Sequence, residues 1–213
     1  MSILPEAPVL LAYAAACLVL FITPGPDMSL FLSRTLTGGR AAGLAALLGT
    51  SAGCCVHTVL AALGVSALLA ASATAFAVLK VLGAAYLLWL AYGAIRHGST
   101  LDLQADRRPP AAHWRSFLVG LGINLTNPKI VLFFVTFLPQ FIDGQDPDAA
   151  GKLVVLGLLF VGGTAPLAVL LILGAERAVG FLTRRPRVTR AIDYLFAGVF
   201  AAFALRIATA PSR

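Results

Sequence analysis

The chain alternates between long apolar blocks and short polar connections. Six blocks can be marked, at about 8–33, 41–70, 74–95, 116–141, 152–174 and 190–208. Most of them reach the roughly 20 residues that an α-helix needs to cross the hydrocarbon core of a bilayer, and the last is the shortest. The apolar residues run continuously instead of alternating with polar ones, which favours membrane helices over a β-barrel. The pattern therefore predicts an all-α membrane protein with six transmembrane helices.

Within the first block, a proline-rich polar stretch interrupts the helical pattern. It consists of Thr23, Pro24, Gly25, Pro26 and Asp27. Each proline removes a backbone donor and clashes with the preceding turn, so the helix must kink or break here. In lipid, the freed backbone groups need protein or a water-filled cavity around them, and an ionisable residue at this depth indicates a functional site. The alternative is a simple proline kink, with Asp27 reaching for the membrane interface.

The fourth block contains a second interruption, at Asn127, Pro128 and Lys129. Pro26 and Pro128 lie 102 positions apart, near corresponding points of the first and fourth blocks. Interrupted helices at matching positions of two three-helix halves are typical of transporters built from inverted repeats, and they mark a binding site near the bilayer midplane. We therefore predict two inverted three-helix repeats, each with its first helix broken at proline.

The repeat also defines the expected domain organisation. Thr50 and Thr164, each preceded by a glycine, are a weaker echo of it in the second and fifth blocks. No separate soluble domain is expected, because the longest polar stretch is too short to build a core. A single transporter domain is predicted over 1–213, with repeats at about 8–95 and 116–208 and a cytoplasmic linker at 96–115.

The residue types at the breaks suit a zwitterion. Proline is favoured at the first position of a helix, and the preceding Gly25 or Asn127 can serve as its cap, so each break starts a second half-helix. The free N–H groups at such a start carry the positive end of the helix dipole and suit a carboxylate. The free carbonyls that end the preceding half-helix suit an ammonium group. An amino acid carries both charges.

Composition and charge support a membrane protein and give its orientation. The chain is 59% apolar and 12% charged, whereas soluble domains are less apolar and about one quarter charged. The net charge of +7 does not indicate a nucleic-acid partner, because the basic residues lie between apolar blocks. Eleven arginines fall in the first, third and fifth connections, and the positive-inside rule places these in the cytoplasm, with both termini outside. They are Arg34, Arg40, Arg96, Arg107, Arg108, Arg115, Arg177, Arg184, Arg185, Arg187 and Arg190.

The predicted substrate and proton site joins the two breaks to polar residues of nearby helices. Its members are Thr23, Pro24, Gly25, Pro26, Asp27, Thr50, Lys80, Asn124, Asn127, Pro128 and Lys129. Burial in a low dielectric disfavours a charged carboxylate, so Asp27 is the candidate proton carrier. Lys129 is either the counter-charge of Asp27 or a contact for the substrate carboxylate. Lys80 can instead extend to the outer surface, and Thr50 can bond within its own helix.

Other polar residues fit structural roles better. His57 can relay protons, but a neutral, hydrogen-bonded packing histidine fits the pattern better. Cys17, Cys54 and Cys55 have no metal-ligand spacing and are interpreted as small packing residues. A membrane thiol–disulfide carrier would need cysteines at the breaks, and a soft-metal exporter would need Cys and His clusters. No nucleophile–base pair or metal triad is apparent, so we predict no enzyme, no cofactor and no metal site.

Several motifs together resemble one family of membrane proteins. They are Thr23-Pro24-Gly25-Pro26-Asp27, Lys80-x-x-Gly83-Ala-Ala-Tyr86-Leu-Leu, Asn127-Pro128-Lys129 and Leu138-Pro139-Gln140-Phe141. This set, with the chain length and the basic third connection, resembles the LysE/RhtB family of amino-acid exporters. The resemblance implies a multi-pass protein of the bacterial inner membrane that exports amino acids or related metabolites, driven by the proton gradient.

Charge balance narrows the expected substrate. A basic amino acid would need surplus carboxylates in the membrane, whereas only Asp27 is clearly there, opposite Lys129 and Lys80. A neutral amino acid such as threonine, homoserine or leucine is therefore expected. Export of metal ions or other small metabolites on the same scaffold is the alternative. The expected partners are the amino acid and the lipid bilayer, with no nucleic acid, and a second copy of the chain in a homodimer is the further partner considered.

Overall fold

The computed structural model describes residues 5–98, 112–142 and 146–209, and these residues form helices without any strand. The elements in chain order are α1 (Ala7–Ile22), α2 (Pro26–Ala71), α3 (Ala73–His97), α4 (His113–Thr126), α5 (Pro128–Leu132), the π-helix η1 (Phe133–Phe137), the 3₁₀-helix η2 (Leu138–Phe141), α6 (Ala149–Leu173), α7 (Ala175–Arg184) and α8 (Pro186–Thr209). The predicted all-α class is confirmed.

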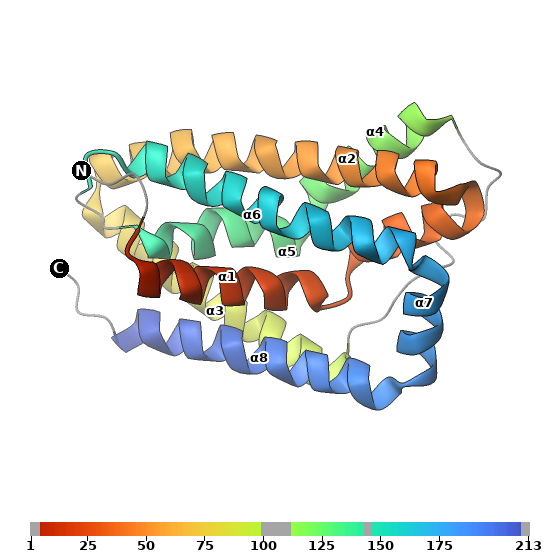
Figure 1. Cartoon of the computed structure of the whole chain (residues 1–213). Coiled ribbons are helices and arrows are strands. Elements are labelled where there is room, and N and C mark those ends of the chain that lie inside the picture. The colour runs from red at the N-terminus through yellow and green to blue at the C-terminus, as the bar shows by residue number, and fades with distance from the viewer. Residues whose placement is uncertain (1–4, 99–111, 143–145, 210–213) are drawn as a thin grey trace.

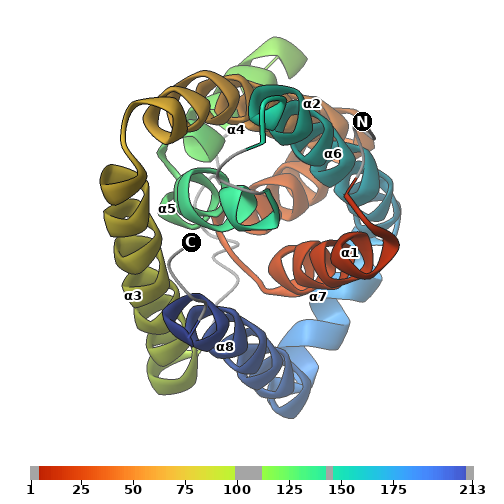
Figure 2. The same cartoon turned by 90° about the vertical axis from the view of Figure 1, so that its left-hand side faces the viewer.

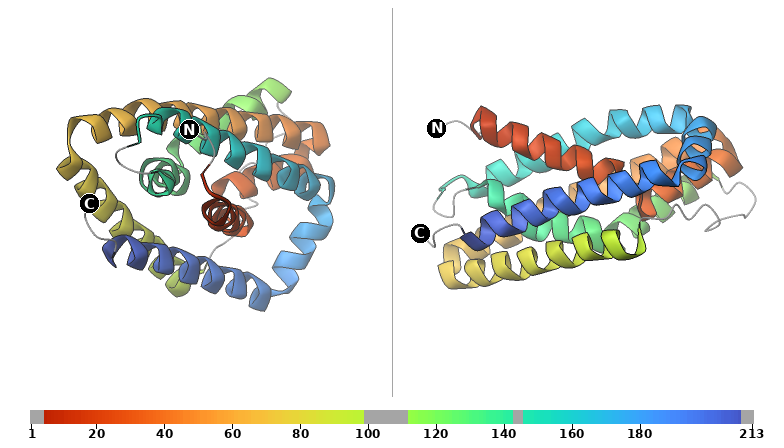
Figure 3. Two further views of the ribbon diagram at one scale, coloured as in Figure 1. Left: turned by 60° about the vertical axis from the view of Figure 1, so that its left-hand side comes forward. Right: turned by 90° about the horizontal axis from the view of Figure 1, so that it is seen from below.

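The long helices run side by side as a bundle, and the two elements next to the sequence breaks lie inside it (Figure 1). Seen from the end, α5 is surrounded by the other helices (Figure 2). In the left view of Figure 3, α1 and α5 both lie within a ring formed by α2, α3, α6, α7 and α8. The bundle therefore surrounds the segments that the prolines interrupt.

Both predicted breaks are present in the backbone. α1 ends at Ile22 and α2 begins at Pro26, with Gly25 in an extended conformation between them. α4 ends at Thr126 and the next helical stretch begins at Pro128, and the two directions differ by 55°. The prolines stand at the first turn of the following helices, where their missing N–H groups leave no hydrogen bond unmade.

α2 contains a third change of direction, at Gly39. This residue has φ of 80° and ψ of 172°, and the chain turns back there at the end of the bundle (Figure 1). A positive φ of this kind is accessible to glycine at little cost, whereas a side chain would strain it. The turn before the second apolar block is thus made at a glycine inside the Gly38-Gly39-Arg40 sequence.

Three helical stretches of the described chain are long and apolar enough to cross a membrane. They are Pro26–Gly64, Ala149–Leu173 and Pro186–Leu205, and the bent pair His113–Thr126 with Pro128–Phe141 is a fourth if it counts as one crossing. α1 is apolar but has only 16 residues. The lengths of these helices are consistent with a multi-pass membrane protein. The six crossings and the inverted symmetry stay predictions.

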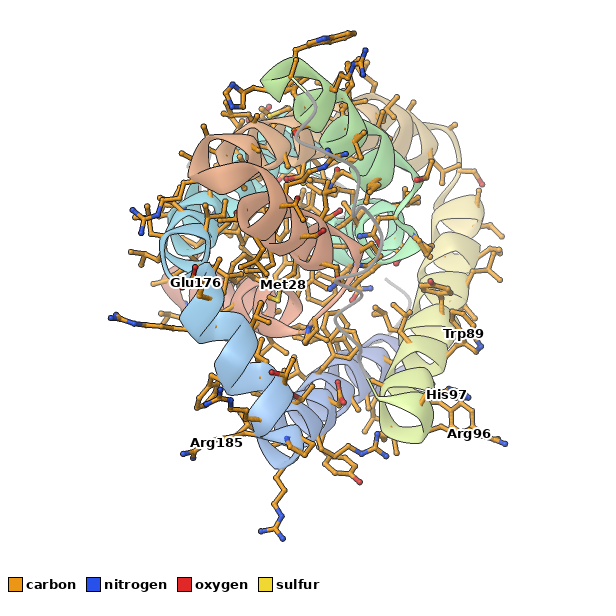
Figure 4. All side chains as sticks on the ribbon, turned by 90° about the vertical axis from the view of Figure 1, so that its right-hand side faces the viewer. Met28, Trp89, Arg96, His97, Glu176 and Arg185 are labelled. Atoms are coloured by element: carbon orange, nitrogen blue, oxygen red, sulfur yellow. The ribbon has the colours of Figure 1, made fainter. Side chains whose placement is uncertain are left out.

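The two ends of the bundle differ in their elements and in their basic residues. α7, the turn at Gly39, the end of α3 and the start of α4 lie at one end, and the start of α1 and the end of α8 lie at the other (Figure 1). Figure 4 shows Arg96, His97 and Arg185 at the outside of the first end, with Met28 inside the bundle. The described parts of the basic connections therefore lie at one end, as the charge count expects. Which side of a membrane this end faces stays a prediction.

Two helices differ from the sequence-based expectation. The fifth connection was expected as a loop, but most of it forms α7, which crosses the end of the bundle at a steep angle to the long helices (Figure 1). The second half of the fourth block was expected as a regular half-helix, but it passes through the π-helix η1, whose Phe133, Phe134 and Phe137 are buried. These phenylalanines belong to an aromatic cluster with Phe160 and Phe200.

Candidate functional site

A cavity lies at the junction of the two helix breaks. It encloses about 590 Å³ that protein atoms do not fill, and this space is partly open to the surroundings. The walls come from α1, α2, α4, α5 and α6, so segments from both predicted repeats contribute. Its lining residues are Leu20, Phe21, Thr23, Gly25, Asp27, Met28, Phe31, Leu47, Thr50, Ser51, Cys54, Asn124, Lys129, Ile130, Phe160, Val161, Thr164 and Ala168.

Asp27 is the only acidic residue among those lining residues. It lies in the first turn of α2, where the helix dipole stabilises a negative charge. Its Oδ2 accepts a hydrogen bond of 2.9 Å from Asn124 Nδ2. Its Oδ1 is buried and makes no direct hydrogen bond within the described residues, although the Asn127 side chain is near enough to stabilise the carboxylate. A buried carboxylate oxygen without a partner is costly, so this atom is suited to a proton or to a cationic group of a ligand.

Lys129 supplies the positive charge of the cavity. Its Nζ donates to the backbone oxygens of Thr23, at 3.0 Å, and of Leu20, at 3.3 Å. It attracts the Asp27 carboxylate electrostatically. Within the described residues, however, no nitrogen–oxygen contact of 4.0 Å or less joins the two. The two charges therefore share one cavity while each has its own hydrogen-bond partners.

Asn124 connects several polar groups behind the cavity. Besides Asp27, its side chain contacts the thiol of Cys54, with Asn124 Nδ2 3.5 Å from Cys54 Sγ. Its backbone oxygen lies 3.3 Å from His57 Nε2, which is therefore the protonated ring nitrogen of this contact. His57 is buried and stacks on Phe134. These contacts favour the packing interpretation of His57, which is not among the lining residues.

Asn127 shapes the second break. Its Oδ1 accepts a hydrogen bond of 3.1 Å from the backbone N–H of Lys129, which is the N-cap arrangement expected before Pro128. Its Nδ2 is buried without a hydrogen-bond partner among the described residues. Asn127 does not line the cavity itself, but it fixes the start of the helix that carries Lys129.

Small residues bring α2 close to α4 beside the cavity. A Cβ atom on Gly49 would lie 2.0 Å from the backbone oxygen of Phe117, and one on Gly53 would lie 2.4 Å from Asn124 Oδ1. On α4, a Cβ on Gly120 would lie 2.3 Å from the backbone oxygen of Ala46 in α2. Gly49 and Gly53, four residues apart on α2, therefore form a small-residue face that packs against α4 and its Asn124.

Two threonines line the cavity, one from α2 and one from α6. Thr50 donates to the backbone oxygen of Leu47 at 2.9 Å, and Thr164 donates to that of Phe160 at 2.7 Å. Both hydroxyl hydrogens are therefore used within their own helices, which was the alternative considered for Thr50. Both residues nevertheless line the cavity, so their oxygens can still accept a hydrogen bond from a ligand.

Most of the predicted site residues come together. Thr23, Gly25, Asp27, Thr50, Asn124 and Lys129 line the cavity. The three prolines and Asn127 form the helix breaks that border it. Lys80 belongs to α3, but its side chain lies outside the described part of the structure. Its role stays a prediction.

Sequence reasoning did not identify Cys54 and the apolar wall. Cys54 was interpreted as a packing residue, but it lines the cavity one helical turn beyond Thr50. The spacing of four residues from Thr50 is the signal that places it on the same face of α2. Phe31, Phe160 and Val161 give the cavity an apolar part, and they could not be distinguished from core residues by their pattern. Within the described ranges, no three His, Cys, Asp or Glu side chains gather as a metal site would require.

Comparison with known proteins gives consistent matches along the chain. The family described as LysE type translocator matches residues 18–210. The chain is 34% identical to an uncharacterized membrane protein of Vibrio cholerae over 203 residues, which is 94% of this chain and 96% of the relative. It is 30% identical to a leucine efflux protein of Klebsiella pneumoniae, covering 95% of each chain. It is 29% identical to a homoserine/homoserine lactone efflux protein of Salmonella typhimurium, covering 89% of this chain and 90% of the relative. No solved structure matches the chain.

Proposed function

The chain belongs to the LysE type translocator family, and from this premise we propose that it exports a neutral α-amino acid from the cytoplasm in exchange for protons. The observation that carries the proposal is the cavity at the two helix breaks, which contains one carboxylate, Asp27, and one ammonium group, Lys129. A zwitterion adds no net charge to such a site. A basic substrate would leave a surplus positive charge at membrane depth, which is unfavourable.

The α-amino group is the part of the substrate that the cavity is best suited to bind. The names of the relatives point to homoserine, homoserine lactone and leucine. All three compounds carry an α-amino group, whereas the lactone has no free carboxylate. Asp27 Oδ1, buried and without a protein partner among the described residues, is the acceptor that we assign to this amino group. The apolar wall with Phe31 and Phe160 is assigned to the substrate side chain.

Proton exchange follows from the same carboxylate. A buried carboxylate is most favourable when it is either protonated or paired with a cation. Asp27 can therefore hold the substrate ammonium on the way out and a proton on the way back. Because the substrate ammonium and the proton compete for one carboxylate, the binding of one releases the other. This competition would couple export to the proton gradient without a second site.

The proposed topology has six crossings in two inverted repeats, at about 8–95 and 116–208, within a single transporter domain over 1–213. The first crossing would be α1 with the start of α2, and the fourth would be α4 with α5, η1 and η2. The gathering of basic residues at the α7 end supports placing this end and the 96–115 linker in the cytoplasm. Both termini would then be periplasmic, with the protein in a bacterial inner membrane. The homodimer stays a prediction.

An efflux experiment tests this function. Cells that overproduce the protein are preloaded with labelled leucine, homoserine, threonine and lysine, and the loss of each label is followed with and without a protonophore. We expect faster loss of at least one neutral amino acid, and we expect the protonophore to abolish the difference. Export of lysine alone, or export that is indifferent to the protonophore, would contradict the proposal. Cells that produce Asp27→Asn are the matched control.

A further inference from the structure

The end of α1 exposes backbone oxygens that its own helix cannot satisfy. The oxygen of Leu20 would normally accept from the residue four positions later, but that residue is Pro24, which has no N–H group. The oxygen of Thr23 lies beyond the end of α1 and faces the break. Both carbonyls are at the negative end of the helix dipole, where a cation is stabilised. This is an arrangement suited to an ammonium group.

In the structure, the side chain of Lys129 supplies that ammonium group. Its Nζ donates to the Thr23 and Leu20 oxygens at 3.0 and 3.3 Å, although Lys129 is more than one hundred residues later in the chain. Gly25 makes room for it, because a Cβ at this position would lie 3.0 Å from Nζ and 3.4 Å from Cε. Gly25 has φ of −171°, an extended conformation that any residue can adopt, so the requirement here is for space.

We propose that the Leu20 and Thr23 carbonyls form an ammonium subsite beside the Asp27 carboxylate, and that Lys129 is its resident occupant. The substrate amino group displaces Lys129 from these carbonyls. The proposal rests on the proposed function for the identity of the displacing ligand. In the empty carrier, Lys129 satisfies the two carbonyls, which would otherwise be costly to bury without a partner.

Displacement also gives a reason for preferring zwitterions. Once it leaves the carbonyls, the Lys129 ammonium needs a new partner inside the cavity. The carboxylate of an amino acid provides that partner, whereas a simple amine of the same size does not. The resident lysine should therefore penalise amines more than amino acids. Lys129 is in this sense a specificity-determining residue.

The test compares L-leucine with 3-methylbutylammonium, which is leucine without its carboxylate. Binding of both to purified protein in nanodiscs is measured by calorimetry for the wild type, Lys129→Met and Lys129→Arg. We expect Lys129→Met to bind the amine at least about tenfold more tightly than the wild type does, since one charged hydrogen-bonded competitor is removed. The preference for leucine over the amine should fall in the same variant. Lys129→Arg keeps a cation and should show neither change. Unchanged or weaker amine binding by Lys129→Met would overturn the proposal.

Chemical rescue provides a second measurement in case Lys129→Met is too unstable for calorimetry. In Lys129→Ala, n-propylammonium replaces the missing part of the side chain and should raise the melting temperature, while n-propanol should not. The wild type should respond to neither compound. Equal responses of the two proteins to n-propylammonium would contradict a resident ammonium. These assays do not use transport, so a failure of amino-acid efflux would contradict the proposed function while the ammonium subsite is tested separately.

Discussion

The charges of Asp27 and Lys129 are the residue-scale feature on which the site depends. Each is held by neutral partners, Asp27 by Asn124 and Lys129 by the carbonyls of the first break. Their mutual attraction acts across a shared cavity instead of through a direct ion pair. Removal of either charge leaves the other uncompensated inside the protein, which is unfavourable.

A double-mutant cycle measures this dependence. Asp27→Asn and Lys129→Gln should each lower the unfolding temperature of the detergent-solubilised protein, because each leaves one charge without its opposite. The double variant should recover part of the loss, which gives an interaction energy of about 0.5–3 kcal/mol between the two positions. Strictly additive losses of stability would mean that the two charges do not interact, which would contradict a single site at the two breaks.

Activity should separate from stability in the same set of variants. Asp27→Asn cannot release a proton, so proton-driven accumulation in inverted vesicles should be lost even when Lys129→Gln restores stability. Asp148→Asn is the matched control, since Asp148 is an exposed carboxylate away from the cavity, and it should retain full accumulation. Full pH-dependent transport by Asp27→Asn would reduce Asp27 to a structural role.

At the scale of the helices, the contact between α2 and α4 positions Asn124 against the cavity. Gly49→Ala should disrupt this contact, because the added methyl group would meet the backbone of Phe117, which cannot rotate away. A loss of about 1–3 kcal/mol in stability is typical of such overpacking. Gly64→Ala is the control, since a Cβ there meets nothing within 4 Å. Similar melting temperatures for the two variants would contradict the close approach of the helices.

The sequence was sufficient to predict those features of the fold that depend on a few neighbouring residues. The prolines at positions 24, 26 and 128 act on their own backbone, so both breaks could be placed to within a residue or two. The π-helix η1 could not be placed, because it depends on packing of Phe133 and Phe137 against other helices. α7 was missed for a different reason. Its arginines suggested a loop, although their spacing leaves Val179 and Leu182 on a partly buried face.

The candidate site was predictable in its polar half and not in its apolar half. Asp27 and Lys129 are exceptional at membrane depth, so each indicates function on its own. Phe31 and Phe160 are ordinary residues in apolar blocks, and only the three-dimensional packing distinguishes cavity wall from core. The hydrogen-bond partners of Lys129 could not be predicted from the sequence either. They are backbone carbonyls, which every residue has, so no residue type indicates them.

At the scale of the whole molecule, the basic residues at one end of the bundle predict how the protein is oriented across the membrane. Single cysteines at Thr183 in α7 and at Asp148 before α6, in a protein without its natural cysteines, report the two ends. A membrane-impermeant maleimide should label Asp148→Cys in intact cells and should label Thr183→Cys only after the membrane is opened. The reverse pattern would place α7 outside and contradict the positive-inside assignment.

The short first helix has a consequence for how the protein is made. α1 has 16 residues and spans about 24 Å, less than the roughly 30 Å of a hydrocarbon core, and its continuation carries Asp27. The hydrogen-bond donor for that carboxylate, Asn124, is 97 residues later. At a synthesis rate of about 5–20 residues per second, the nascent chain waits roughly 5–20 seconds for it. In the proposed six-crossing topology, the first crossing would lack this partner during that interval, and its insertion would be completed only when the second half of the protein arrives.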